Sequence, residues 1–378
     1  MRSFVRQALA LGIVSLLGIA PARADKLLDE TTDFTGTFIY LQSKVPGLVI
    51  GAVQNGESSV HGFGKIGDGS DKEPDGDTLM RIGSITKVFC GATLASMVAD
   101  GKVHFTDRLQ DRLGWDVTIP TRDGKEIRLI DLATHSSGLP REAEGAPAEV
   151  ATAERSKDDY VNSLALPDPL LFAPGTGILY SNFGFDLLAQ ALGHAAGEPY
   201  ADLLKERVLD PAGLTSTKFD ITEADKAHTM QGHNFDGAPM PFLPTSPLIV
   251  GAGGLYSSTN DMLRWLKWHL DRFSPNQAEM RLLDHAVYLD RDGLKPVFGV
   301  DEGGPMDAMS LGWVVMRPEG SRPLILHKSG GLQGQFSFVA MAPTRGIGVF
   351  VSMNQFSVDG FEAMSKAAIG LITELANR

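Results

Sequence analysis

The residue pattern predicts a mixed α/β fold in which one mainly antiparallel sheet is interrupted by a long, mainly helical insertion. Short β-rich segments occur early, at residues 48–53 and 59–64, and similar segments separated by turn residues recur from residue 311 onward. Between the two groups, residues 106–301 show mostly helical spacing with many Pro and Gly breaks. We therefore expect strands from both ends of the chain to share one sheet.

The first residues have the features of a secretory signal. Arg2 and Arg6 precede an apolar run at residues 8–17, and residues 22–24 (Ala-Arg-Ala) form a small-residue cleavage site. A retained membrane anchor is the alternative, but the run is well short of the ~20 residues that a membrane-spanning helix needs. We expect residues 1–24 to be removed, the mature protein to be periplasmic, and no stable membrane span to remain.

The rest of the chain divides into two interleaved subdomains. Residues 25–105 and 302–378 are expected to form an α/β sheet subdomain, and residues 106–301 a mainly helical inserted subdomain. The single cysteine, Cys90, excludes an intramolecular disulfide. It lies in an apolar helical pattern, which indicates a buried packing residue rather than a nucleophile.

The charge of the chain excludes one class of partner. The formal net charge is −12, and loss of the three arginines of the signal would make it −15. Such a surface repels nucleic acid. We expect no nucleic-acid partner, and we expect the protein to be a monomer.

The early strands predict a hairpin, because Asn55-Gly56 between them is a favoured two-residue turn. The polar stretch at residues 67–78 follows. It contains four aspartates whose spacing does not match an EF-hand loop: Asp68, Asp71, Asp75 and Asp77. We expect a solvated loop there, and neither a metal nor another cofactor in the protein.

Ser84 begins an apolar helical pattern that ends at Gly101. Lys87 lies three residues further along, so both side chains share one helical face at about 5 to 6 Å and Lys87 can reach the Ser84 hydroxyl. Desolvation and the like charge of Lys328 would disfavour the ammonium form and make Lys87 a base near neutral pH. Taken alone, the Ser-x-x-Lys pattern also fits a capping serine followed by a surface lysine.

Tyr180 and Asn182 lie between a turn at residues 174–175 and an apolar helix. A structural interpretation is a buried tyrosine with an asparagine cap. In the functional interpretation, Tyr180 relays a proton between the serine, the lysines and a leaving group, while the Asn182 amide orients a substrate carbonyl.

A third segment, residues 327–331, places a lysine beside a serine and two glycines. On a strand, Lys328 can face a cleft and Ser329 can donate to a carboxylate, while Gly330 and Gly331 allow a substrate backbone to approach. His327 points to the opposite face, so we expect a structural role for it. The three segments together supply a hydroxyl nucleophile, two bases and a cationic clamp, as an acyl-transfer hydrolase of carboxylate-bearing amides requires.

These segments resemble the serine β-lactamase and penicillin-binding protein superfamily, specifically its class C branch with Ser-x-x-Lys, Tyr-x-Asn and Lys-Thr/Ser-Gly motifs. Residues 132–140 and 253–258 extend the resemblance, which runs from about residue 48 to the C-terminus. Within the branch, residues 137–142 and 311–314 are most similar to the AmpH-type D-alanyl-D-alanine carboxypeptidase/endopeptidases. The resemblance implies an α/β (α+β) sandwich, with a mainly antiparallel sheet flanked by helices, an all-helical region beside it and the cleft between them.

The resemblance also implies a role for each motif residue. Ser84 is then the acylated nucleophile, Lys87 and Tyr180 are the proton-transfer pair, and the backbone N–H groups of Ser84 and Gly331 form the oxyanion hole. The substrate-binding residues are then Asn182, Lys328, Ser329 and Gly330. Ser329 replaces the commoner threonine but keeps the hydroxyl.

The function implied is that of a periplasmic serine DD-peptidase that hydrolyses peptidoglycan peptides through an acyl-serine and also binds penicillins and other β-lactams. A class C β-lactamase is the first alternative, and it differs in how readily water reaches the acyl group. An esterase is another, although Lys328 as a carboxylate clamp argues against it. A non-hydrolysing penicillin-binding sensor is the last, and the intact nucleophile and bases argue against that.

Overall fold

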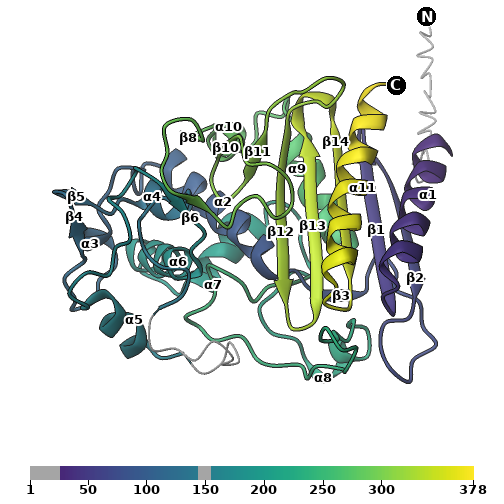
Figure 1. Ribbon diagram of the computed structural model, residues 1–378, viewed down its shortest axis with the longest axis horizontal. Helices are drawn as coiled ribbons and strands as arrows, with labels where there is room; N and C mark the ends of the chain where they lie inside the picture. Colours follow the sequence, from purple (N-terminus) through teal and green to yellow (C-terminus); the bar gives the residue numbers. More distant parts are fainter. Residues whose placement is uncertain (1–25, 144–154) are drawn as a thin grey trace, which may run out of the picture.

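The computed structural model describes residues 26–143 and 155–378. The predicted signal, residues 1–24, lies outside the described residues. In the described part, an antiparallel sheet carries helices on both faces and a mainly helical region lies beside it (Figure 1). This arrangement confirms the predicted α/β sandwich.

The central sheet has eight strands in the order β2-β1-β14-β13-β12-β11-β10-β8, and all neighbouring strands are antiparallel. They are β1 (Gly47–Gln54), β2 (Glu57–Gly64), β8 (Leu289–Asp290), β10 (Ala308–Met309), β11 (Val314–Met316), β12 (Ile325–Leu332), β13 (Gln335–Ala342) and β14 (Ile347–Met353). Short pairs elsewhere are β3 (Leu79–Arg81) with β7 (Tyr256–Ser258), β4 (Thr121–Arg122) with β5 (Lys125–Glu126), and β6 (Ile178–Leu179) with β9 (Val297–Phe298).

Strands β1 and β2 form the predicted hairpin. Asn55 and Gly56 have φ of 51° and 87°, the left-handed conformation that an Asn-Gly turn adopts readily. Strand β1 then pairs with β14, with Gly51 opposite Phe350. Strands from the two ends of the chain therefore do share one sheet, as the pattern predicted.

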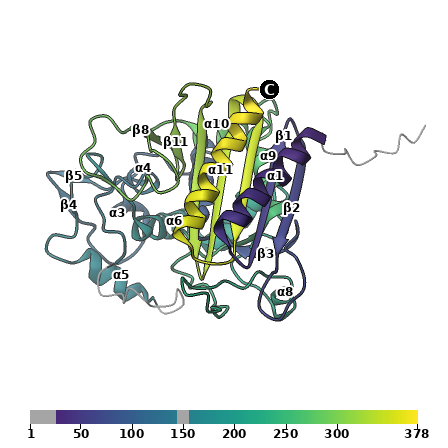
Figure 2. The ribbon, with the colours of Figure 1, turned by 45° about the vertical axis from the view of Figure 1, so that its right-hand side comes forward.

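Helices cover both faces of this sheet. Helices α1 (Lys26–Ser43) and α11 (Val358–Ala376) pack together on one face, and α9 (Thr259–Leu270) packs on the other (Figures 1 and 2). Since α9 falls within residues 106–301, that range supplies a helix to the sheet as well as the helical region. The remaining helices are α2 (Thr86–Ala99), α3 (Leu109–Arg112), α4 (Leu129–Ala133), α5 (Lys157–Leu164), α6 (Asn182–Ala196), α7 (Tyr200–Leu204), α8 (Glu223–Lys226) and α10 (Ala278–His285).

Helix α1 is an element that the sequence pattern did not predict. Its buried face mixes Leu28 and Ile39 with threonines, which weakens the apolar periodicity. Thr32 and Thr35 donate their hydroxyls to the carbonyls four residues earlier, so these polar side chains are buried without losing a hydrogen bond.

Two sequence predictions concern single features of the chain. Cys90 is completely buried in α2, and burial raises the pKa of its thiol to about 12, so it is a packing residue as predicted. Within residues 26–143 and 155–378, no helix has both the length and the apolar character needed to cross a bilayer.

Candidate active site

Ser84 is held at a tight junction between β3 and α2. A short 3₁₀ turn, Gly83–Ile85, connects the two, and Gly83 has φ of +52°, which favours glycine. Strand β12 packs directly on this turn: a Cβ added to Gly330 would lie 2.0 Å from the Ile82 carbonyl oxygen and 3.0 Å from the Ser84 nitrogen. The glycines of β12 thus allow the backbones of Ser84 and Gly331 to approach each other, where the predicted oxyanion hole requires them.

Lys87 is completely buried beside Ser84. Its Nζ lies 3.4 Å from Ser84 Oγ, 2.6 Å from Asn182 Oδ1 and 2.7 Å from the Ala252 carbonyl oxygen. The structure therefore brings the first two predicted segments together around one amine. It also excludes the interpretation of Lys87 as a surface residue.

The electrostatics of the site favour a neutral Lys87. The pKa of its amine is lowered to about 7: burial is the main cause, the carboxylates of Asp186 and Glu142 partly oppose the shift, and the positive charge of Arg141 adds to it. Desolvation is the main cause, as predicted. Arg141 is the like charge that lowers the pKa of Lys87, and the repulsion between Lys87 and Lys328 that the sequence suggested lowers the pKa of Lys328.

Asp186 is a buried acid that sequence reasoning missed. It accepts hydrogen bonds from the Tyr160 hydroxyl at 2.8 Å and from the Ala252 N–H at 2.9 Å, and burial raises its pKa to about 7. Asp186 therefore accepts the backbone N–H of Ala252, while Lys87 donates to the backbone carbonyl of the same residue. The sequence does contain a signal for this residue. Asp186 follows Asn182 by four residues on an otherwise apolar helix, so the two side chains lie on the same helical face.

Tyr180 lies among three cationic side chains. The Lys87 and Lys328 nitrogens are 4.8 and 4.7 Å from its ring centroid, and the Arg141 guanidinium carbon is 4.8 Å from it. The ring also stacks on His135, with centroids 4.5 Å apart. The ring is nearly buried, so its orientation is set by these neighbours rather than by solvent.

Asn182 is part of a chain of polar contacts and does not cap α6. Ser181 is the cap, because its Oγ accepts the N–H of Gly184 at 2.9 Å. The Asn182 amide instead accepts from Lys87 and donates to Glu142, which forms an ion pair with Arg155. Glu142 and Arg155 are further site residues that sequence reasoning did not assign.

Lys328 and Ser329 occupy different positions relative to the cleft. Ser329 lines a cavity of about 930 Å³ together with Ser84 and Arg141. Lys328 is buried beside Tyr180 rather than in this lining, and burial is the main cause that lowers its pKa.

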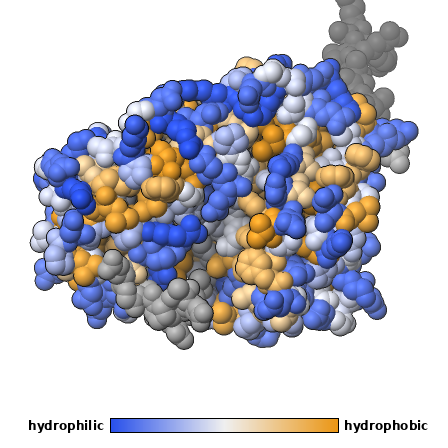
Figure 3. Space-filling model, in the orientation of Figure 1, coloured by the Kyte–Doolittle hydropathy of each residue, from blue (hydrophilic) through white to orange (hydrophobic). Residues whose placement is uncertain are grey.

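The far wall of the same cavity is aromatic. It includes Phe336 and Phe356, whose centroids are 4.9 Å apart, and Phe361 of α11. The space-filling view shows a hollow in this face of the molecule with hydrophobic residues beside it (Figure 3). The cavity therefore offers an apolar surface next to the nucleophile.

Two other residues have structural roles near the site. His327 is buried on β12 beside Phe338, and burial lowers its pKa to about 3, which agrees with the structural role predicted for it. Arg81, which sequence reasoning missed, is buried on β3 and donates to the Gly254 carbonyl and to Thr245. It thereby holds the loop that presents Ala252 to Lys87.

Comparisons with known proteins agree with this geometry. Residues 16–374 match the family model described as Beta-lactamase. The chain is 30% identical over 372 residues to the D-alanyl-D-alanine-carboxypeptidase/endopeptidase AmpH of Escherichia coli (strain K12), which covers 97% of this chain and 94% of that protein. It is 25% identical over 349 residues to a beta-lactamase of Pseudomonas fluorescens, with coverage of 86% and 93%.

Solved structures show the same relationship. A beta-lactamase/D-alanine carboxypeptidase from Yersinia pestis, crystallised with citrate, has a TM-score of 0.84 at 32% identity, covering 92% of this chain and 98% of that one. A class C beta-lactamase from Rhodobacter sphaeroides has a TM-score of 0.74 at 24% identity, covering 91% and 99%, which is a likeness of fold. The resemblance stated from the motifs is confirmed.

Proposed function

Since the chain belongs to the beta-lactamase family, whose members are serine hydrolases, we propose that it is a periplasmic serine DD-peptidase. In this proposal it acts as a D-alanyl-D-alanine carboxypeptidase/endopeptidase on peptidoglycan peptides, and it also binds penicillins. The observation that carries the proposal is the buried Lys87 amine 3.4 Å from Ser84 Oγ, with a pKa lowered to about 7. The periplasmic location depends on the predicted signal at residues 1–24.

The proposed reaction has two halves. Neutral Lys87 accepts the hydroxyl proton while Ser84 Oγ attacks the carbonyl carbon of the D-alanyl amide, and the backbone N–H groups of Ser84 and Gly331 stabilise the oxyanion. The C–N bond then breaks, and the leaving amine takes that proton through Tyr180. Water attacks the resulting acyl ester and gives a proton to the base. The ester C–O bond then breaks, Ser84 Oγ takes that proton back from the base, and the peptide leaves as a carboxylic acid.

Intact-protein mass spectrometry tests this proposal directly. The wild-type protein should gain one penicillin adduct, and it should release D-Ala from a D-Ala-D-Ala peptide. Ser84→Ala should do neither while keeping the far-UV circular dichroism spectrum of the wild type. Substantial D-Ala release by Ser84→Ala would rule out the acyl-serine route.

A class C β-lactamase is the second candidate, supported by the 25% identity to the Pseudomonas fluorescens beta-lactamase. Both activities acylate the same serine, and they differ in how readily water reaches the acyl group. Steady turnover of a cephalosporin without cleavage of a D-Ala-D-Ala peptide would favour this candidate. Stoichiometric acylation with no turnover of either substrate would favour a penicillin-binding sensor.

A further inference from the structure

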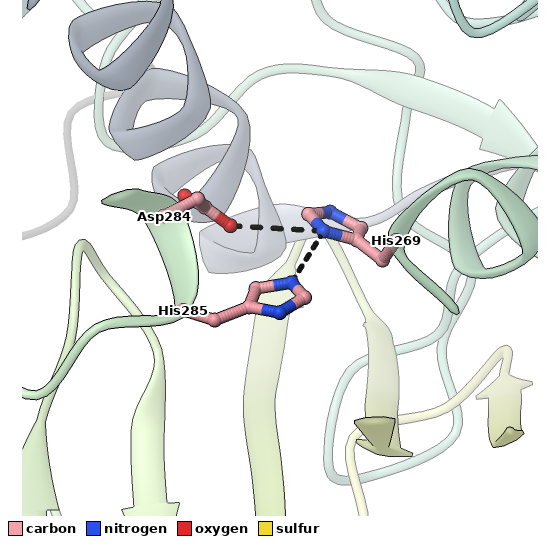
Figure 4. Close-up of side chains that lie close together, drawn as sticks. All are labelled: His269, Asp284 and His285. Atoms are coloured by element: carbon pink, nitrogen blue, oxygen red, sulfur yellow. Dashed lines mark hydrogen bonds and ion pairs between the residues drawn. The ribbon is translucent and has the colours of Figure 1, made fainter. Parts of the chain in front are cut away.

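A second group of titratable side chains lies outside the cleft, where the C-terminal ends of α9 and α10 meet. Figure 4 shows His269, Asp284 and His285 pointing toward one another. His269 Nδ1 lies 2.8 Å from His285 Nε2 and 3.7 Å from Asp284 Oδ2, and the three donor atoms all lie within 4.8 Å of one another. Two imidazole nitrogens and a carboxylate oxygen thus converge on one point.

Among the described residues, no lysine or arginine side chain balances the charge of Asp284. Asp284 is completely buried, and Trp313 Nε1–H donates to its Oδ2 at 2.9 Å. Its Oδ1 has no hydrogen-bond partner within residues 26–143 and 155–378, and no lysine or arginine of these residues forms an ion pair with it. A buried carboxylate in this state is costly unless a cation compensates it.

We propose that His269, Asp284 and His285 bind one divalent transition-metal ion of the zinc type. Imidazole nitrogen and carboxylate oxygen are ordinary zinc ligands. Donor atoms at about 2.0–2.1 Å from a tetrahedral ion are about 3.3 Å apart. Two of the separations here, 2.8 and 3.7 Å, bracket that value, and the third is no more than 4.8 Å, so a bound ion would draw the donors to a common spacing. The unpartnered Asp284 Oδ1 is then available as a further ligand atom.

Neighbouring aromatic side chains hold two of these ligands in place. The Trp313 N–H fixes the Asp284 carboxylate, which is the usual task of a group behind a metal ligand. The His269 ring packs edge-on against Trp265, with centroids 4.1 Å apart and planes at 76°. The His269 ring is therefore fixed by a buried aromatic neighbour.

The site would act as a structural clamp behind the catalytic helix. Trp313 follows Gly312, whose N–H donates to the Ala133 carbonyl at 2.9 Å, and the adjoining Leu311 carbonyl touches α2 at Gly91. An ion joining α9 to α10 would therefore support the back of α2. This inference stands on its own contacts and does not depend on the proposed peptidase activity.

Metal binding to the full chain tests the inference. The protein is stripped with a chelator, dialysed against Zn²⁺ or Co²⁺, desalted and measured by inductively coupled plasma mass spectrometry. The wild type should retain one ion per chain, Co²⁺ should give the visible absorption of a low-coordinate site, and Zn²⁺ should raise the midpoint of thermal unfolding. His285→Asn should retain less than a tenth of an ion.

A matched control is the surface histidine His61, which also lies beside two carboxylates, Asp29 and Asp33. His61→Asn should retain the full ion. If His285→Asn does not fold, Asp284→Asn replaces it, because it removes the charge but keeps an acceptor for Trp313. The inference is overturned if the desalted wild type holds no ion, which would leave a neutral hydrogen-bonded histidine pair, or if either folded variant retains the metal.

Discussion

At the scale of single residues, the decisive feature is the burial of two amines that the sequence alone shows only as lysines. Lys87 contacts the nucleophile and two further acceptor atoms, whereas Lys328 lies against the Tyr180 ring. Their roles are therefore separable by substitution and by pH.

The first prediction concerns the pH dependence of acylation. A lysine accepts a proton only when it is neutral, and the folded-state pKa of Lys87 is lowered to about 7, so kcat/KM should rise as the pH increases through about 7. Below that value it should fall by roughly tenfold per pH unit. The measurement is the acylation rate with a chromogenic cephalosporin between pH 5 and pH 9.

Asp186→Asn is the control for this profile. The Asp186 carboxylate raises the pKa of Lys87, so its removal should move the midpoint to lower pH. Because the pKa of Asp186 is also about 7, the wild-type midpoint belongs to the coupled pair. A flat wild-type profile would be incompatible with Lys87 as the base.

The second prediction separates two roles of Lys328. If its ammonium binds the substrate carboxylate, Lys328→Ala should lower kcat/KM for peptides with a free terminal carboxylate by about 10- to 100-fold, the loss of a charge-assisted hydrogen bond. Amidated peptides should change by less than about threefold. Equal losses on both kinds of peptide would mean that Lys328 acts through its contact with Tyr180 and does not bind the substrate carboxylate.

At the scale of elements, close backbone contacts decide where helices and strands meet. α2 packs against the Leu311 backbone at Gly91, and β12 packs against the turn before Ser84 at Gly330. Glycine has a low helix propensity, so it is unfavourable in the middle of a helix. Tertiary contact therefore overrides local preference at Gly91.

The third prediction compares Gly91 with a glycine of α11 that has no such contact. In Gly91→Ala, the new Cβ would lie 2.1 Å from the Leu311 carbonyl oxygen, so we expect a loss of about 1–3 kcal/mol in the free energy of unfolding. In Gly370→Ala, the same change in α11 meets nothing within 4 Å, and we expect a gain of up to about 1 kcal/mol. Urea denaturation of both variants provides the comparison, and a stable Gly91→Ala would show that α2 can shift.

At the scale of the whole molecule, the sheet separates two hydrophobic layers. Alternate residues of β14 face opposite ways: Phe350 joins the layer of α2 and α9, and Val349 joins the layer of α1 and α11. The layer of α1 and α11 is the outer layer, and it does not touch the nucleophile. It can therefore be weakened without altering the site chemistry.

The fourth prediction tests the outer layer through α1. Ile39→Ala should lower the free energy of unfolding by about 2–5 kcal/mol, because Ile39 is completely buried. Leu41→Ala on the same helix should change it by less than about 0.5 kcal/mol, since Leu41 is 69% exposed. Penicillin acylation by folded Ile39→Ala should match the wild type, and a large decrease would mean that the outer layer shapes the site.

Alternating and helical spacing and the Asn-Gly turn sufficed to predict the sheet and its N- and C-terminal halves, because these signals are local. The clustering of Ser84, Lys87 and Asn182 was predicted from the order of the motifs and from the family resemblance. Helix α1 was not predicted from the sequence. Its buried face contains threonines whose hydroxyls donate to carbonyls of the same helix, and these polar residues weaken the apolar periodicity. Only the tertiary structure decided the depth of Lys328, the Asp186 and Glu142 partners, and the meeting of His269 with Asp284 and His285. Burial, and hence the pKa of each group, depends on which distant segments pack around it, and no local pattern in the chain records that.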